Sequence, residues 1–372
     1  MPEIRLEGLC KTFGDTVAAD GLSLDIADGE YVCILGPTGA GKTTCMRMIC
    51  GLTRPDSGRV YFDGEDITDK DIDLRETTML SQTYALFPNM NVYGNVKFAP
   101  TIKEWPEESS KQIVKSMLHM VHLEKKAEWK VGELSGGQQQ RIALARALAS
   151  GSKVLLLDEP LRALDARLRI DLRKELRAMA KGMNLTCIHV THDQDEALEM
   201  ADRIAVIRHG RIIQSGTPME VFQDPATPFV ANFVGRSNMI TGKVVNSDGV
   251  TTDIEAAGGK VFKARASDLQ AGEEAVLAIK VGSTKISHLS GEGQEMFCSG
   301  RVERMLYEGA TITVELAVDG LGLISAKLPN RKYEDYRPGD EVAVHWMPSK
   351  ASVFRIPEGG LEKELRLDRW ER

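Results

Sequence analysis

The sequence predicts an α/β domain built on a largely parallel sheet, followed by a small all-β domain. Three observations support this prediction. From about residue 4 to residue 234, short apolar runs alternate with helical patterns, as they do in layered α/β folds. After Gly235, short strand-like segments are separated by Gly, Asp and Pro turns. A length of 372 residues is also too great for one ordinary domain and sufficient for two, each with its own core.

Three apolar runs are the best strand candidates in the first domain: residues 31–35, 154–157 and 186–191. The second run, Val-Leu-Leu-Leu, is apolar at every position, which is typical of a strand covered on both faces. Between about residues 89 and 132 the β pattern gives way to charged helix formers, with a helix start at Trp-Pro-Glu-Glu in residues 105–108. We therefore expect a helical subdomain there.

The second domain is predicted to be a small all-β barrel, of which the OB fold is one form. Its predicted strands lie within residues 242–250, 275–280, 300–318, 323–328 and 341–346. We set the domains at residues 1–235 and 236–372. The charged tail, residues 361–372, has too little apolar surface to be assigned a role.

Composition excludes several classes of protein. Apolar residues make up 42% of the chain and charged residues 27%, which is ordinary for a globular protein, and a net charge of -7 gives no reason to expect nucleic acid as a partner. No window approaches the roughly 18 apolar residues of a bilayer span, and the charged N-terminus does not resemble a signal peptide. The six cysteines lack metal-binding spacing, so we expect reduced, mostly buried thiols in the cytosol.

A phosphate-binding loop is the first functional motif. Residues 36–43 fit the pattern GxxxxGK[ST], and an apolar strand precedes them while a helix follows and stops near Gly51. Glycines let backbone N–H groups turn inward around an anion, Lys42 reaches the β and γ phosphates, and Thr43 ligates Mg²⁺. The alternative is a Gly-rich turn that binds nothing. The predicted nucleotide-binding residues here are Gly36, Pro37, Thr38, Gly39, Ala40, Gly41, Lys42, Thr43 and Thr44.

Two carboxylates follow the apolar run 154–157, at the end of a strand where open α/β sheets place their ligands. We expect Asp158 to hold Mg²⁺ through water and Glu159 to polarise the attacking water. The alternative is that one of them only caps a helix or turn.

Two further polar residues end predicted strands. His192, in Val-Thr-His-Asp, is predicted to contact the γ-phosphate and orient the water, although such a histidine on its own is more often structural. Its neighbour His189 is assigned that structural role. Gln82 is predicted to reach Mg²⁺ and sense the γ-phosphate, and a solvated loop glutamine is its alternative role.

The most specific segment is Leu-Ser-Gly-Gly-Gln-Gln-Gln-Arg at residues 134–141, which precedes a helical run. Ser135 caps that helix, and glycines leave its N–H groups open to a phosphate. A second anion site in a chain that already has one makes sense if two copies face each other and each closes over the other's nucleotide. The predicted ligands of this half-site are Ser135, Gly136, Gly137 and Gln138.

In order and spacing, these motifs resemble the ABC transporter ATPase family over about residues 3–235. The resemblance implies binding of ATP with Mg²⁺ and ATP hydrolysis. It further implies that Phe13 stacks on adenine, with a core phenylalanine as the alternative role. Finally, the resemblance implies that the region from Gln82 to Pro88 contacts a coupling helix of a transmembrane permease subunit.

A longer match includes Gly-Thr-Pro at residues 216–218 and residues 229–235, before a β domain. It resembles the importer ATPases of the maltose, glycerol-phosphate and polyamine groups, which carry a C-terminal OB-type domain called TOBE. Two departures lie near the nucleotide motifs: Arg162 stands where the family usually has Ser, and Val131 where it usually has Pro. In the β domain, Lys-Val-Gly at 280–282 replaces the Arg-Pro-Glu common in the sugar group, and residues 336–346 look closer to polyamine and ferric-ion importers.

The expected function is that of an ATP-hydrolysing subunit at the cytoplasmic side of the cell membrane. It dimerises around two ATP molecules and drives uptake of a polyamine, ferric ion or sugar, with an external solute-binding protein as an indirect partner and no nucleic-acid partner. One alternative is a soluble ABC ATPase with a regulatory role or a role linked to nucleic acid or the ribosome. Another alternative is that the barrel domain is chiefly a regulatory binding module and that the ATPase activity is secondary. The transported molecule is not readable from this chain.

Overall fold

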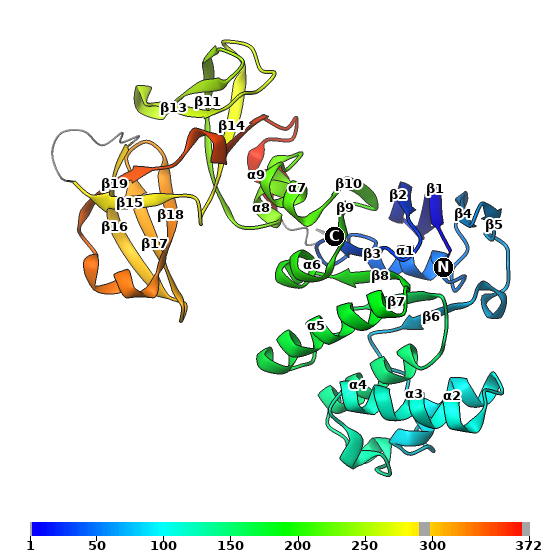
Figure 1. Cartoon of the computed structure of the whole chain (residues 1–372). Helices are drawn as coiled ribbons and strands as arrows, with labels where there is room; N and C mark the ends of the chain where they lie inside the picture. The colour runs from blue at the N-terminus through cyan, green and yellow to red at the C-terminus, as the bar shows by residue number, and fades with distance from the viewer. Residues whose placement is uncertain (1, 290–297, 367–372) are drawn as a thin grey trace. The chain divides into compact units, whose positions relative to one another are not determined.

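The computed structural model describes residues 2–289 and 298–366, which form two compact units that meet in sequence after Pro218 (Figure 1). The short helices α7 (Pro218–Gln223) and α8 (Pro228–Phe233) come between the predicted catalytic motifs and the β domain. Helix α8 packs on the β11 and β14 strands of the second unit. The functional boundary after residue 235 stays a prediction.

The first unit contains two sheets. A six-stranded sheet has the order β10-β9-β3-β8-β7-β6, and all its neighbours pair in parallel except the edge strand β10. An antiparallel sheet has the order β2-β1-β4-β5. The parallel sheet confirms the predicted α/β class, whereas the antiparallel sheet was not predicted.

The strands of the first unit are β1 (Ile4–Phe13), β2 (Thr16–Ile26), β3 (Tyr31–Leu35), β4 (Ser57–Phe62), β5 (Glu65–Asp66), β6 (Thr77–Leu80), β7 (Val154–Asp158), β8 (Thr186–Thr191), β9 (Arg203–Arg208) and β10 (Arg211–Gly216). Its helices are α1 (Lys42–Ile49), α2 (Val92–Ile102), α3 (Glu107–Met120), α4 (Gly136–Leu148), α5 (Ala166–Gly182) and α6 (Gln194–Met200). Short 3₁₀ turns lie at Ile72–Arg75, Glu124–Lys126 and Val131–Glu133.

One apolar core holds the strands that precede the predicted site residues. Every residue of β3, β7 and β8 is buried, as predicted for strands covered on both faces. Helix α1 lies between the antiparallel sheet and the β7 and β8 strands, and α5 and α6 pack against each other and cover the opposite face (Figure 1). The carboxyl ends of the parallel strands therefore meet along one edge of a rigid sheet.

The predicted helical subdomain is formed by α2 and α3, which pack against α4. Helix α2 begins where the Asn91 side chain accepts a hydrogen bond from Gly94 N, and α3 begins directly after Pro106. The start of α3 agrees with the predicted helix start at residues 105–108, whereas the cap of α2 was not predicted.

The second unit consists of two five-stranded antiparallel sheets in the orders β13-β12-β11-β14-β20 and β15-β19-β16-β17-β18. They enclose a shared apolar core, which includes Phe262, Leu277 and Trp346. This all-β architecture is consistent with the predicted OB-like barrel. Of the predicted tail, residues 361–365 form the short helix α9 (Leu361–Leu365), and residues 367–372 lie outside the described residues.

The strands of the second unit are β11 (Ser237–Ser247), β12 (Thr251–Ala256), β13 (Val261–Arg265), β14 (Glu274–Lys280), β15 (Lys285–His288), β16 (Cys298–Tyr307), β17 (Thr311–Val318), β18 (Gly322–Pro329), β19 (Glu341–His345) and β20 (Ala351–Arg355). Short 3₁₀ turns lie at Ala257–Gly259, Asn330–Asp335 and Pro348–Lys350.

Lys280, the last residue of β14, caps the C-terminal end of α8. Its ammonium donates hydrogen bonds to the carbonyl oxygens of Ala231 (2.5 Å), Val234 (2.5 Å) and Gly235 (2.9 Å). A cation near the last carbonyls of a helix is favourable. However, these acceptors are neutral, and burial lowers the pKa of Lys280 from its usual 10.5 to about 7.

We predict that the second unit becomes more stable as pH rises. Between about pH 7 and pH 10.5 the unfolded chain carries a proton on Lys280 that the folded chain lacks, so the free energy of unfolding increases with pH in this window. The Lys280→Met variant should lack this part of the pH dependence. Urea unfolding of both proteins at several pH values, monitored by hydrogen exchange in a peptide from β14, measures the free energy of unfolding. The same dependence of this free energy on pH in both proteins would contradict the prediction.

Candidate functional site

The phosphate loop connects β3 to α1. Lys42 lies at the start of α1, and its ammonium donates to the carbonyl oxygens of Gly36 (2.9 Å) and Pro37 (2.8 Å), which holds the loop closed. A Cβ atom on Gly36 would lie 2.4 Å from Ile207 O, so no larger residue fits there. Gly41 has φ of 99° and its Cβ would lie 2.1 Å from Ala18 O. The curled loop thus depends on glycine at both positions.

Burial lowers the pKa of the Lys42 ammonium, and the negative charges of Glu159 and Asp158 oppose this shift. Only 7% of Lys42 is exposed. The structure therefore places a nearly buried cation at the mouth of the loop, where a phosphate is the natural counter-ion.

Asp158 ends β7 beside the loop. The Thr43 hydroxyl donates to its Oδ2 atom over 3.0 Å, whereas Oδ1 is buried and has no hydrogen-bond partner among the described residues. Burial raises the pKa of the Asp158 carboxyl and outweighs the opposing hydrogen bond from Thr43, and the charge of Glu159 adds to the rise. A buried carboxylate oxygen without a partner is costly unless a ligand satisfies it.

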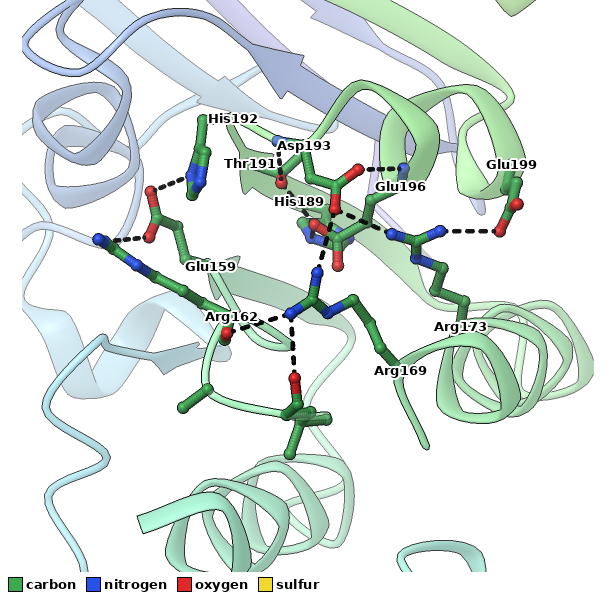
Figure 2. A network of polar contacts seen from close by, with 12 residues as sticks. Glu159, Arg162, Arg169, Arg173, His189, Thr191, His192, Asp193, Glu196 and Glu199 are labelled. Atoms are coloured by element: carbon green, nitrogen blue, oxygen red, sulfur yellow. Dashed lines mark hydrogen bonds and ion pairs between the residues drawn. The ribbon is translucent and has the colours of Figure 1, made fainter. Parts of the chain in front are cut away.

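Glu159 is held in an uncommon backbone conformation, with φ of 50°. Its Oε1 atom is hydrogen-bonded to His192 Nδ1 over 2.9 Å, and its Oε2 atom forms an ion pair with Arg162 Nη1 over 2.7 Å (Figure 2). Burial opposes ionisation of Glu159, but the hydrogen bonds from His192 and Arg162 prevail, and the pKa of its carboxyl is lowered. The carboxylate is therefore ionised and positioned.

Lys42, Glu159 and Arg162 border an open cavity of about 1060 Å³, whereas Asp158 and His192 are not among the residues that line it. This volume is large enough for a nucleotide. Besides Lys42, Glu159 and Arg162, the residues that line it are Asp15, Thr16, Ala18, Thr38, Gly39, Gly41, Thr43, Thr44 and Gln82.

Some predicted ligands lie elsewhere. Phe13 does not line the cavity, although Asp15 and Thr16, two and three residues further on, do. The centroid of its half-exposed ring lies 5.6 Å from the Lys11 ammonium. Pro37 and Ala40 shape the loop through a hydrogen bond between Ala40 N and Pro37 O.

The second anion half-site is separate from the first. Ser135 caps α4 by accepting a hydrogen bond from Gln138 N, and the Gln138 side chain accepts one from Ser135 N. Ser135 and Gly136 are exposed, and this turn does not contribute to the cavity around Lys42. The two turns that the sequence predicts to bind phosphate therefore do not line one cavity within a single chain.

Sequence reasoning missed the residues that connect these segments. Buried Gln140 donates to Glu159 O over 3.2 Å and accepts from Ala163 N over 3.0 Å, so α4 is tied to the loop that follows β7. Arg169 bonds to the carbonyl of Leu164 and forms an ion pair with Asp193 (Figure 2). Gln140 belongs to a run of three glutamines, and nothing in the run distinguishes the buried one.

Comparison with known proteins identifies the family. A model of the ABC transporter family matches residues 19–162, and a model of the TOBE domain matches residues 278–354. The spermidine/putrescine import ATP-binding protein PotA of Nitratidesulfovibrio vulgaris is 36% identical over 363 residues, which cover 96% of this chain and 98% of that protein. PotA of Vibrio cholerae is 38% identical over 355 residues, covering 94% and 93%. The chain belongs to the importer-type ATP-binding subunits of ABC transporters.

Solved structures agree with this assignment. A bacterial ABC transporter cassette solved as a dimer has 32% identity and a TM-score of 0.54, and the match covers 58% of this chain and 98% of that cassette. A dimeric ATP-binding cassette in a post-hydrolysis state, bound to ADP and phosphate, has 31% identity and a TM-score of 0.53. As an importer-type ABC ATPase, the chain binds and hydrolyses ATP, and its second unit contains a TOBE domain. Both predictions made from the motifs are thus confirmed.

No helix in the described part of this ABC ATPase combines the length and apolar character of a membrane span.

Proposed function

We propose that this ABC ATPase is the motor of a polyamine importer and that two copies close around two ATP molecules to drive uptake. One observation carries the proposal: Gln82 and Glu159 line the cavity beside the glycine-rich loop, whereas the exposed turn at Ser135 does not contribute to it. The polyamine class rests on the relatives named as spermidine/putrescine import proteins.

The phosphate loop binds ATP in this proposal. Inward-facing N–H groups of the glycine-rich turn and the start of α1 hold the β and γ phosphates, and Lys42 exchanges its two carbonyl acceptors for phosphate oxygens. Phe13 lies on the antiparallel sheet near the cavity-lining Asp15 and Thr16, and we assign it to the adenine ring.

The residues around Asp158 fit Mg²⁺. The buried Oδ1 of Asp158, which has no partner in the part of the chain that the structure describes, and the Thr43 hydroxyl are oxygen ligands of the kind that Mg²⁺ prefers. Thr43 and Gln82 line the cavity. When bound, Mg²⁺ supplies positive charge to the phosphate oxygens. We therefore propose that Thr43, Asp158 and Gln82 hold it, directly or through water.

Glu159 accepts a proton from the attacking water, because its ionised carboxylate faces the cavity beside Lys42. His192 fixes the carboxylate through its Oε1 atom and contacts the γ-phosphate. The left-handed backbone of Glu159 and the hydrogen bond between Glu159 N and Val190 O keep this residue in place.

The second copy supplies Ser135, Gly136, Gly137 and Gln138. Helix α4 is 13 residues long, so its N-terminus carries a useful partial positive charge, and Ser135 and Gly136 at this end are exposed. The solved relatives that are dimers support this arrangement.

The permease subunits dock on the segment from Gln82 to Pro88. Tyr84 and Ala85 have positive φ angles of 59° and 43°, and Arg146 of α4 holds both their carbonyls, over 2.9 Å and 2.8 Å. Arg146 also lies 5.1 Å from the Phe87 ring. A strained segment tied to α4 is suited to pass movement to a partner. We place the protein peripherally on the cytoplasmic face of the membrane, with an external solute-binding protein as an indirect partner.

Transport by a reconstituted complex tests the proposed function. We expect vesicles that contain this ATPase and the permease subunits copurified with it to take up spermidine or putrescine when ATP is inside and the binding protein is outside. Vesicles with the Lys42→Ala variant are the control and should show none. Uptake of maltose or ferric ion in place of polyamines would overturn the substrate class, and copurification with ribosomes or DNA without membrane proteins would overturn the importer.

A further inference from the structure

Both oxygens of the Glu159 carboxylate are engaged in this structure. Arg162 Nη1 lies 2.7 Å from Oε2, and His192 Nδ1 lies 2.9 Å from Oε1, on the opposite side (Figure 2). The hydrolysis proposed above assigns no step to the arginine, and the hydrogen bond from His192 also favours the ionised carboxylate. The guanidinium occupies Oε2 and fixes the orientation of the carboxylate, so this oxygen does not accept a hydrogen bond from water while the pair is formed.

The backbone brings Arg162 to Glu159. Arg162 N donates to Glu159 O over 3.4 Å in a tight turn, and buried Gln140 bridges the two ends of that turn through Glu159 O and Ala163 N. From the other side, Arg169 donates to the carbonyl oxygens of Arg162 (3.4 Å) and Leu164 (3.0 Å). These hydrogen bonds hold the backbone of the turn, which keeps Arg162 within reach of the Glu159 carboxylate.

The side chains of Glu159 and Arg162 differ in how freely they can move. The Glu159 side chain is 9% exposed, whereas that of Arg162 is 65% exposed. The arginine can leave the pair for water at little cost, while the carboxylate stays in place. Because Gln140 belongs to α4, the helix that starts at Ser135, a shift of α4 is transmitted to both ends of the turn that carries Arg162.

We propose that Arg162 is a positioning residue that restrains the Glu159 carboxylate in the isolated subunit and keeps its ATP turnover low. The restraint is relieved when a second copy engages the start of α4 and moves the turn through Gln140. This inference rests on the proposed role of Glu159. It assigns the low ATP turnover of the isolated subunit to Arg162, which stands where similar ATPases usually have serine.

The test compares the ATPase rates of the isolated full-length protein and its Arg162→Ser, Arg162→Lys and Arg167→Ser variants at a concentration where the subunits are mainly monomeric. Arg162→Ser should raise kcat about two- to fivefold, the rate change expected when an exposed ion pair is removed, and leave KM for ATP unchanged. Arg162→Lys should restore most of the low rate. Arg167, an exposed cation of the same segment with no ion pair among the described residues, is the matched control and should change nothing.

Two outcomes would overturn the inference: an unchanged or reduced kcat in Arg162→Ser with an unchanged melting temperature, or an equal rise in Arg162→Lys and Arg162→Ser. Glu159→Gln, measured in parallel, separates the two proposals. If Glu159→Gln is inactive and Arg162→Ser is not faster, only the restraint fails. If Glu159→Gln hydrolyses ATP normally, the proposed role of Glu159 fails as well.

Discussion

Lys42→Ala is expected to weaken ATP binding by at least about 100-fold. Hydrogen bonds between a charged group and a phosphate contribute roughly 1.5–3 kcal/mol each, and 1.4 kcal/mol corresponds to a factor of ten in affinity. Lys42 is the nearly buried cation at the mouth of the loop, and its alanine variant also leaves the carbonyl oxygens of Gly36 and Pro37 without their donor.

Calorimetric titration with Mg-ATP measures this effect. Lys115→Ala, which removes an exposed lysine from α3, is the matched control and should bind ATP like the unmodified protein. A far-ultraviolet spectrum and a melting curve for both variants show whether the fold is intact. Unchanged affinity in a folded Lys42→Ala protein would refute the assignment of Lys42 to the phosphates.

Glu159→Gln is expected to lower ATP turnover by about 10²- to 10⁴-fold, the usual contribution of a general base, while ATP binding persists. Glutamine has nearly the same shape and retains an oxygen that accepts from His192 or Arg162, so the site keeps its geometry. It does not accept a proton from water at neutral pH. The loss should therefore appear in kcat and not in the dissociation constant of ATP.

Two measurements test these expectations: phosphate release at saturating Mg-ATP gives kcat, and equilibrium binding gives the dissociation constant of ATP. Glu108→Gln on α3, an exposed carboxylate remote from the cavity, should hydrolyse at the normal rate. Normal hydrolysis by Glu159→Gln would remove Glu159 from the catalytic role.

The parts of the fold that the sequence predicted are those in which local pattern and burial agree. Strands β3, β7 and β8 are buried throughout, so their apolar runs are unmistakable, and the start of α3 after Pro106 follows from proline chemistry. The sheet that contains β1 and β2 was missed. Its strands have one solvated face and depend on pairing with β4, which is distant in sequence.

The second unit shows the same limit. Of its strands, β12, β13, β15 and β20 were not predicted, because they are short and half exposed and gain stability from neighbours such as β11 and β14. Residues 300–318, predicted as one strand-like segment, turn back at 308–310 and form β16 and β17.

The candidate site was predictable where its residues are contiguous, as in the phosphate loop and the turn at Ser135. Contacts between segments were not. The bridge from Gln140 to Glu159 O joins positions that are 19 residues apart, and the pair between Arg162 and Glu159 depends on a backbone with positive φ at Glu159 that the sequence does not reveal. The family resemblance marked Arg162 as a departure from the usual serine, but it did not reveal the contact with Glu159.

The central claim is that a single ATP is gripped by the phosphate loop of one copy and the Ser135 turn of another. Sedimentation of the Glu159→Gln protein with and without Mg-ATP tests it most directly, because this variant should hold the nucleotide without consuming it. We predict a monomer without nucleotide and a dimer of twice the mass with Mg-ATP. A protein that binds Mg-ATP yet stays monomeric, alone and beside its permease subunits, would contradict the account.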